Sequence, residues 1–264
     1  GLTFVYQAAQ NEGDQLGQLS IAEDLINQGF GALLFSPQSD ANLVPAVEKA
    51  KAAGIPVLNV NDAVIPSAEH YVGNVQKDNG VRVAQWFIDN RPDGGKVAVI
   101  EGQPGVYAAG QRTAGFTETI NASGKFEVVA SVPANWSREE AFNAATTILQ
   151  QYPDLTGFYA NNDGMALGVV EAVKAAGKQE TVAVFGTDGV SDAYAAIKAG
   201  DLTGTVDSFP VLTGEIAMEV ALRLMAGQAL PRVVATPQAL ITKDNVDTYA
   251  TTDMAALRAA LTAK

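Results

Sequence analysis

The chain has 264 residues, of which 47% are hydrophobic and 17% are charged, a balance typical of one large folded domain or two smaller ones. Seventeen Lys and Arg residues against 29 Asp and Glu give a formal net charge of −12, which argues against a nucleic-acid partner. The chain has no Cys and one His, His70. Disulfides, thiol chemistry and metal sites built on histidine pairs are therefore excluded, and we expect neither a cofactor nor a metal.

Short runs rich in apolar and β-branched residues alternate with segments of helical period, which is typical of an α/β fold with parallel strands. Strands are predicted at residues 3–6, 32–35, 56–60, 71–72, 96–100, 127–131, 157–159, 182–185, 204–206 and 238–242. Helices are predicted around residues 16–26, 43–50, 81–88 and 216–224, the last closed by Gly227, and along the Ala-rich tail at 247–264.

Small and polar residues follow several of the predicted strands, where each strand gives way to a helix. These clusters lie at residues 36–37, 59–62, 102–105, 161–164 and 187–189. Open parallel sheets bind ligands outside the carboxyl ends of their strands. We therefore expect the functional site along this edge.

Four stretches of sequence occur in an order and spacing more specific than any one of them alone. They are AGIPV at 53–57, GQRTAGF at 110–116, NNDGMALG at 161–168 and VFGTDG at 184–189. Together they make the chain resemble, over most of its length, the ribose-binding-protein-like sugar-binding proteins of ABC transporters, within the type I periplasmic binding proteins.

The resemblance implies two similar α/β/α lobes with parallel sheets, joined by three crossings and closing over a sugar. The crossings are expected near residues 74–76, 208–209 and 235–237. One lobe would hold residues 1–74 and 209–235, and the other residues 76–207 and 236–264, including the tail. It also implies a periplasmic location, a monomer, and a membrane permease as partner.

The chain departs from this family at its start, because residues 1–7 align with the family's second strand. The first strand and helix of the N-terminal lobe would then be missing. In a sheet ordered 2-1-3-4-5 the first strand is central, so its two neighbours would lack hydrogen bonds without it. We expect that segment to precede the sequence in the full protein; a truncated second gene product is the alternative.

A sugar or polyol offers many hydroxyl groups on small apolar faces, so its site needs amides, carboxylates, a guanidinium and an aromatic wall. By position in the matching motifs, the resemblance implies ligand contacts from Asn61, Asp62, Arg112, Trp136, Asn162, Asp188, and one of Asp207 and Ser208.

Each of the main candidates also has a structural alternative. Arg112 could be a solvated surface residue, Asp188 and Asn162 could cap helices, and Trp136 could belong to the core. Relatives that bind ribose carry Asp-Arg where this chain has Asn61-Asp62. The change removes a positive donor, which argues against ribose itself and favours another small neutral sugar or polyol.

Three functions compete for this fold class. The sequence favours a solute-binding protein for transport, because binding needs no nucleophile or base. The alternative is the effector-binding core of a LacI-type transcriptional repressor, which has the same fold but dimerises and works with DNA; the acidic charge argues against it. A sugar-converting enzyme would need an acid and base pair, for which Asp188 and Asp207 could be proposed.

Overall fold

The structure is a computed structural model that describes residues 3–11, 13–61 and 63–262. The chain divides into two compact units. Unit 1 spans residues 1–74, 105–108 and 211–236, and unit 2 spans residues 75–104, 109–210 and 237–264. Each unit is built on its own sheet.

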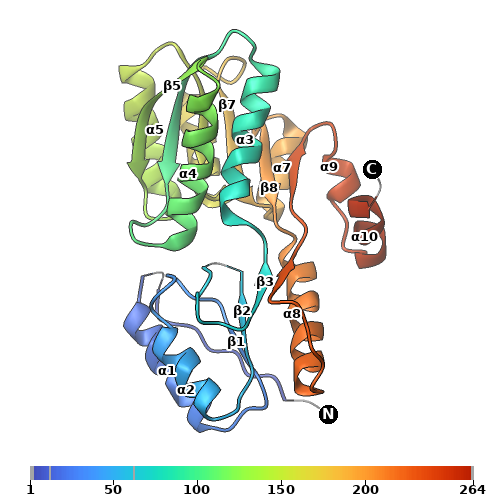
Figure 1. The fold of residues 1–264 in the computed structure, drawn as a ribbon. Coiled ribbons are helices and arrows are strands. Elements are labelled where there is room, and N and C mark those ends of the chain that lie inside the picture. Colours follow the sequence, from blue (N-terminus) through green and yellow to red (C-terminus); the bar gives the residue numbers. More distant parts are fainter. Residues whose placement is uncertain (1–2, 12, 62, 263–264) are drawn as a thin grey trace. The chain divides into compact units, whose positions relative to one another are not determined.

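Unit 1 is a parallel sheet covered by helices on both faces (Figure 1). Its strands run in the order β1 (Leu33–Phe35), β2 (Val57–Val60), β3 (His70–Gly73) and β9 (Val233–Ala235). The covering helices are α1 (Gln15–Asn27), α2 (Val44–Ala52) and α8 (Pro210–Met225). Successive strand residues point to opposite faces. Leu33 and Phe35 accordingly pack under α1 and α2, whereas Leu58 and Val72 pack against α8.

Unit 2 is a larger sheet whose strands are parallel except for one edge. The order is β10 (Ala239–Thr242), β8 (Gly204–Asp207), β7 (Ala183–Asp188), β6 (Leu155–Ala160), β4 (Gly95–Glu101) and β5 (Phe126–Pro133), with β10 antiparallel to β8. The remaining described helices are α3 (Gln76–Asn90), α4 (Tyr107–Ala122), α5 (Arg138–Gln151), α6 (Asp163–Ala175), α7 (Ser191–Ala199), α9 (Val246–Tyr249) and α10 (Met254–Thr262).

The core of unit 2 is centred on Phe87 of α3. Its ring centroid lies 5.4 Å from that of Trp86, 6.0 Å from Phe116, 6.1 Å from Phe126 and 5.6 Å from Phe185. Edge-to-face aromatic contacts at these separations add to the free energy of apolar burial. The cluster joins α3 and α4 to the sheet, so the strand ends that carry the candidate site rest on a packed support.

The predicted α/β class is confirmed, but the strand predicted at residues 3–6 is wrong. Residues 3–9 have no regular structure, and the side chains of Phe4 and Tyr6 are 67% and 79% exposed. A strand persists only when its backbone groups find partners, and the described sheet of unit 1 pairs β1 with β2 alone. The other predicted strands lie close to their expected positions, and β9 was not predicted.

No helix among the described residues combines the length and the apolar character needed to cross a lipid bilayer.

Candidate functional site

Five of the predicted site residues lie along one edge of the unit 2 sheet. Trp136 follows β5, Asn162 follows β6, Asp188 ends β7 and Asp207 ends β8. Arg112 lies in α4, the helix that follows β4. Because the carboxyl ends of parallel strands meet at one edge, the topology gathers these side chains where ligands of open α/β sheets bind.

Arg112 is the buried centre of this group, with 7% of its surface exposed. Its Nε donates to Oε1 of Gln76 at 2.9 Å, and its Nη1 donates to the carbonyl of Asn161 at 2.7 Å and to Oδ1 of Asp188 at 3.2 Å. Arg112 is therefore not a solvated surface residue. Within the described part of the chain no hydrogen bond occupies Nη2, so the fork still offers two N–H groups.

Asp188 brings a carboxylate to the same point with its side chain 38% exposed. It does not cap α7, because the residue at the N-cap position is Val190. Its backbone φ of 126° lies in a region that residues with a side chain seldom adopt. The Asp188 carboxylate thus sits at the edge with its charge balanced by Arg112.

The two asparagines after β6 have different structural roles: Asn162 caps a helix, and Asn161 bonds to neighbouring segments. Asn162 is itself the N-cap of α6, and its Oδ1 accepts the N–H of Met165 at 2.8 Å. Asn161 is fully buried, and its Oδ1 accepts the N–H of Gly102 at 3.0 Å and the hydroxyl of Thr113 at 3.1 Å. The cap uses Oδ1 of Asn162 and leaves its Nδ2 as a donor for a ligand hydroxyl.

Trp136 is held against the end of β4 by an unusual backbone. Asn135 and Trp136 both have left-handed φ angles, of 50° and 63°. The indole ring lies so close to Gly102 that a Cβ at that position would be 2.2 Å from it. Its Nε1 is buried and has no hydrogen-bond partner among the described residues, which leaves one donor unsatisfied beside the candidate site.

The end of β8 distinguishes Asp207 from Ser208. Asp207 is 5% exposed, and its two oxygens accept the N–H of Phe209 at 2.6 Å and the hydroxyl of Tyr194 at 2.8 Å. Burial is the main cause that raises the pKa of Asp207 to about 6, against the lowering effect of these two hydrogen bonds. Ser208 is more exposed than Asp207.

Asn61 lies apart in unit 1, directly after β2. Its backbone is left-handed, with a φ of 62°. Its N–H donates to the carbonyl of Val72 at 2.9 Å, and its carbonyl accepts the hydroxyl of Tyr71 at 2.9 Å. The half-buried side chain is thus carried by a fixed backbone. Asp62, the other predicted contact from unit 1, lies outside the described residues.

Sequence reasoning missed the residues beneath this edge, chiefly Gln76, Asp163 and Tyr194. Gln76 orients Arg112 by accepting its Nε–H, and the Tyr194 hydroxyl donates to Oδ2 of Asp207. Asp163 is fully buried and stands within the same polar run as Asn162. That run was the available signal, but spacing alone does not tell which of three adjacent polar side chains turns inward.

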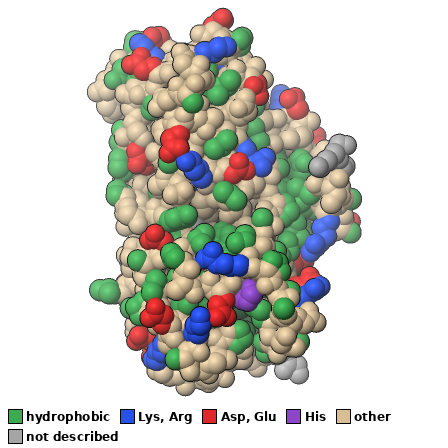
Figure 2. Space-filling view, in the orientation of Figure 1, with side chains coloured by type: hydrophobic (Ala, Val, Ile, Leu, Met, Phe, Trp, Pro, Cys, Tyr) green, Lys and Arg blue, Asp and Glu red, His purple; other side chains and the backbone are tan. Residues whose placement is uncertain are grey.

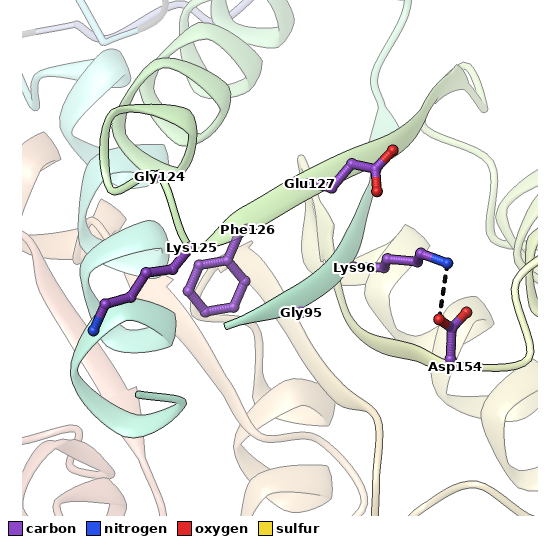
Figure 3. A pocket seen from close by; sticks show the side chains of 7 residues that line it. All are labelled: Gly95, Lys96, Gly124, Lys125, Phe126, Glu127 and Asp154. Carbon is purple, nitrogen blue, oxygen red and sulfur yellow. Dashed lines mark ion pairs between the residues drawn. The ribbon is translucent and has the colours of Figure 1, made fainter. Parts of the chain in front are cut away.

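Two hollows lie away from the candidate residues. A shallow one of about 440 Å³ opens at the amino ends of β4 and β5, where Lys96 pairs with Asp154 at 2.8 Å (Figure 3). A larger one of about 990 Å³ lies in unit 1 and is lined mainly by apolar side chains of residues 3–9, α1, β1 and α8. Neither contains the polar set that the sequence predicted.

Charged side chains on the face shown in Figure 2 are mixed, with Lys and Arg dispersed among Asp and Glu. No continuous basic surface of the kind that binds a phosphate backbone is visible on that face. The described residues also contain no cluster of three or more acidic or His side chains suited to a metal ion.

The comparison with known families agrees with this arrangement. Residues 1–229 match the family described as periplasmic binding protein domain. The chain belongs to the periplasmic binding protein family. The resemblance found in the four sequence motifs is thus confirmed, and with it the two-lobe α/β architecture of the family.

Three similar proteins indicate which ligands members of this group bind. The D-allose-binding periplasmic protein of Escherichia coli (strain K12) is 36% identical over 88% of this chain and 78% of its own. The xylitol-binding protein of Mycolicibacterium smegmatis is 32% identical over 93% and 70%. A solute-binding protein of an ABC transporter from Actinobacillus succinogenes 130z, solved with bound D-allose, has a TM-score of 0.87 and 30% identity over 93% and 88%. These relatives are binding proteins rather than enzymes.

Proposed function

We propose that this protein captures a small neutral sugar or polyol and delivers it to the membrane permease of an ABC transporter. Arg112, Trp136, Asn162, Asp188 and Ser208 would contact the ligand from unit 2. Asn61 and Asp62 would add contacts from unit 1. Asp207, which is 5% exposed and bonded to Tyr194 and Phe209, would support Ser208 instead of touching the ligand.

The observation that carries this proposal is the ion pair between the buried guanidinium of Arg112 and the partly exposed carboxylate of Asp188. The guanidinium is fixed by Gln76 and Asn161, so its remaining N–H groups and the Asp188 carboxylate form a rigid donor and acceptor pair. Adjacent hydroxyl groups of a sugar both donate and accept, which suits such a pair. Because the two charges balance each other, the pair favours a neutral ligand.

The same geometry supports binding without turnover. A glycosyl or acyl reaction would need an acid and a base that reach the substrate. Asp207, one of the two residues that the sequence offered for such a pair, has its oxygens bonded to Tyr194 and Phe209 and is almost fully buried. Asp188 alone does not supply both functions.

The relatives support the remaining parts of the proposal. Their names place an allose-binding protein in the periplasm and a solute-binding protein with ABC transport. We infer the same location, the same kind of permease partner, and a monomer that binds no nucleic acid. Gel filtration at micromolar concentration tests the monomer, because a dimer would elute at twice the mass of 27.5 kDa.

The deciding experiment is a thermal-unfolding screen against D-allose, D-ribose, xylitol and myo-inositol, followed by titration calorimetry. A ligand at 100 times its dissociation constant stabilises the folded protein by about 2.7 kcal/mol, which raises the Tm by roughly 5 to 10 °C at this size. In Arg112→Ala and in Asp188→Ala we expect the affinity to fall at least about 100-fold, or about 2.7 kcal/mol.

Arg82→Ala is the matched control, since Arg82 is a partly exposed arginine of the same unit paired with Asp78. It should bind like the wild type. If no neutral sugar or polyol shifts the Tm while a phosphorylated sugar does, the proposed ligand class is wrong. If Arg112→Ala binds normally, the assignment of the site is wrong.

A further inference from the structure

Asp163, which is not among the predicted ligand contacts, ties three elements of unit 2 together beneath the site. It is the first residue of α6 and is 0% exposed. Its Oδ2 accepts the N–H groups of Gly189 at 2.8 Å and of Val190 at 3.0 Å. Its Oδ1 accepts the hydroxyl of Thr205 of β8 at 2.6 Å. The side chain therefore connects α6 to the turn after β7 through one oxygen and to β8 through the other.

The turn that Asp163 fixes is the one that carries Asp188. The φ of 126° at Asp188 is costly for a residue with a side chain, so the surroundings must hold it. The two amides that follow Asp188 are the ones that Asp163 accepts. Space for the carboxyl group is provided by Gly186, where a Cβ would lie 2.2 Å from Oδ1 of Asp163.

We propose that Asp163 is a positioning residue for ligand binding, which acts by holding the Gly189 and Val190 amides so that Asp188 keeps its carboxylate beside Arg112. This rests on the proposed function, in which Asp188 contacts the ligand. Asp163 itself touches no ligand, because it is fully buried.

The raised pKa of Asp163 fits a role that depends on its hydrogen bonds and not on its charge. Burial, reinforced by the Asp188 carboxylate, raises the pKa of Asp163 to about 8, against the hydrogen bonds from Thr205, Val190 and Gly189. The hydroxyl groups of Tyr159 in β6 and Tyr194 in α7 also interact electrostatically with the Asp163 carboxyl. When the carboxyl is protonated, Oδ2 still accepts the two N–H groups, and the hydrogen bond with Thr205 is kept with its direction reversed, from the Oδ1–H to the hydroxyl oxygen. An asparagine side chain reproduces this pattern.

The test compares Asp163→Ala with Asp163→Asn in two measurements. The first is amide hydrogen exchange at Gly189 and Val190, which needs no ligand. We expect it to be at least about tenfold faster in Asp163→Ala than in the wild type and close to the wild-type rate in Asp163→Asn. Asp154→Ala, at the opposite edge of the sheet, is the control and should leave both amides unchanged.

The second measurement is the affinity for D-allose, D-ribose and xylitol by calorimetry. Asp163→Ala should lose about tenfold or more in affinity, whereas Asp163→Asn should stay within about a factor of two. In an Asp188→Asn background, which weakens the ligand contact, Asp163→Ala should add less than about twofold, because it acts through Asp188.

An equal loss in both backgrounds would show that Asp163 does not act through Asp188 and would overturn the proposal, as would unchanged exchange at the two amides. If the wild type binds none of the probes, the proposed function fails, while the exchange data still decide whether Asp163 holds the turn. Should Asp163→Ala not fold, Asp163→Ser, one bond shorter than aspartate, takes its place in both measurements.

Discussion

Arg112 illustrates how one side chain can be both structural and functional. Its Nε and Nη1 bind Gln76, Asn161 and Asp188, which lie in or beside three different elements. Only a planar guanidinium serves three acceptors in fixed directions; the ammonium of a lysine is a point charge on a flexible stem. This is the reason that Arg112 orders the edge of the sheet as well as offering N–H groups to a ligand.

Trp136 provides an optical test of the site, because the chain has only two tryptophans. Trp136 lies beside Gly102 at the candidate site, whereas Trp86 packs in the core with its ring centroid 4.7 Å from that of Phe185. We expect a sugar to change the fluorescence of the wild type and of Trp86→Phe, but not of Trp136→Phe. A change retained in Trp136→Phe would mean that the indole is not against the ligand.

Asp163 should also leave a mark on stability as a function of pH. The folded pKa of Asp163 is about 8 and the ordinary value is 3.8. Below pH 3.8 the group is protonated in both states, and between the two values only the folded state holds the proton, so stability falls as pH rises. Each pH unit in that window costs at most about 1.4 kcal/mol.

The measurement is urea unfolding of the wild type and of Asp163→Asn at pH 5 and at pH 8. The free energy of unfolding of the wild type, minus that of Asp163→Asn, should decrease by a few kcal/mol between the two. Asp207, whose pKa is also raised, is present in both proteins and so largely cancels. A constant difference would mean that Asp163 is ionised in the folded protein.

At the residue level the sequence identified which strand ends carry polar groups but not which way each group points. Arg112 and Asp188 were predicted on one edge, and the structure joins them. Asn162 was predicted as a ligand contact with helix capping as the alternative, and in the structure it is the N-cap of α6. Capping depends on the φ and ψ of a single residue and on helix phase, which a run of adjacent polar residues does not determine.

Among the elements, strands could be predicted from sequence where both of their faces are buried, but not where a short segment becomes a strand only by pairing with a neighbouring strand. β4 and β7 read as continuous apolar runs because helices cover both faces of the sheet. Residues 3–6 have the same local composition but no pairing in the described structure. β9 is three residues long and largely exposed, and it is a strand only because it pairs with β3.

Phe87 is the residue through which α3 stabilises unit 2. It is fully buried and touches four aromatic rings. Phe87→Ala should lower the free energy of unfolding by about 3 to 5 kcal/mol, because the cavity adds to the lost burial. Phe4→Ala, at an exposed position, should change it by less than about 0.5 kcal/mol. Urea unfolding measures both, and equal effects would contradict the packing described.

For the whole molecule, two units that each bury apolar side chains on their own sheet predict two unfolding events. Unit 1 buries its apolar side chains on the two faces of its own sheet, under α1 and α2 on one face and under α8 on the other, whereas the core of unit 2 surrounds Phe87. We expect calorimetry without ligand to give a measured enthalpy larger than the van't Hoff enthalpy. Phe87→Ala should lower only one of the two transition temperatures. A single transition with equal enthalpies, shifted as a whole by Phe87→Ala, would contradict this.

The order in which the sheet of unit 1 closes has a consequence for biosynthesis. Tyr71 of β3 pairs with Val233 of β9, and α8 covers Leu58 and Val72. At about 5 to 20 residues per second, the ribosome needs on the order of ten to thirty seconds to make the chain between these partners. If the sheet forms while the chain is being made, one of its apolar faces stays uncovered throughout that time, while the strands of unit 2 emerge. The nascent chain should therefore depend on chaperones most while residues 75–210 are being translated.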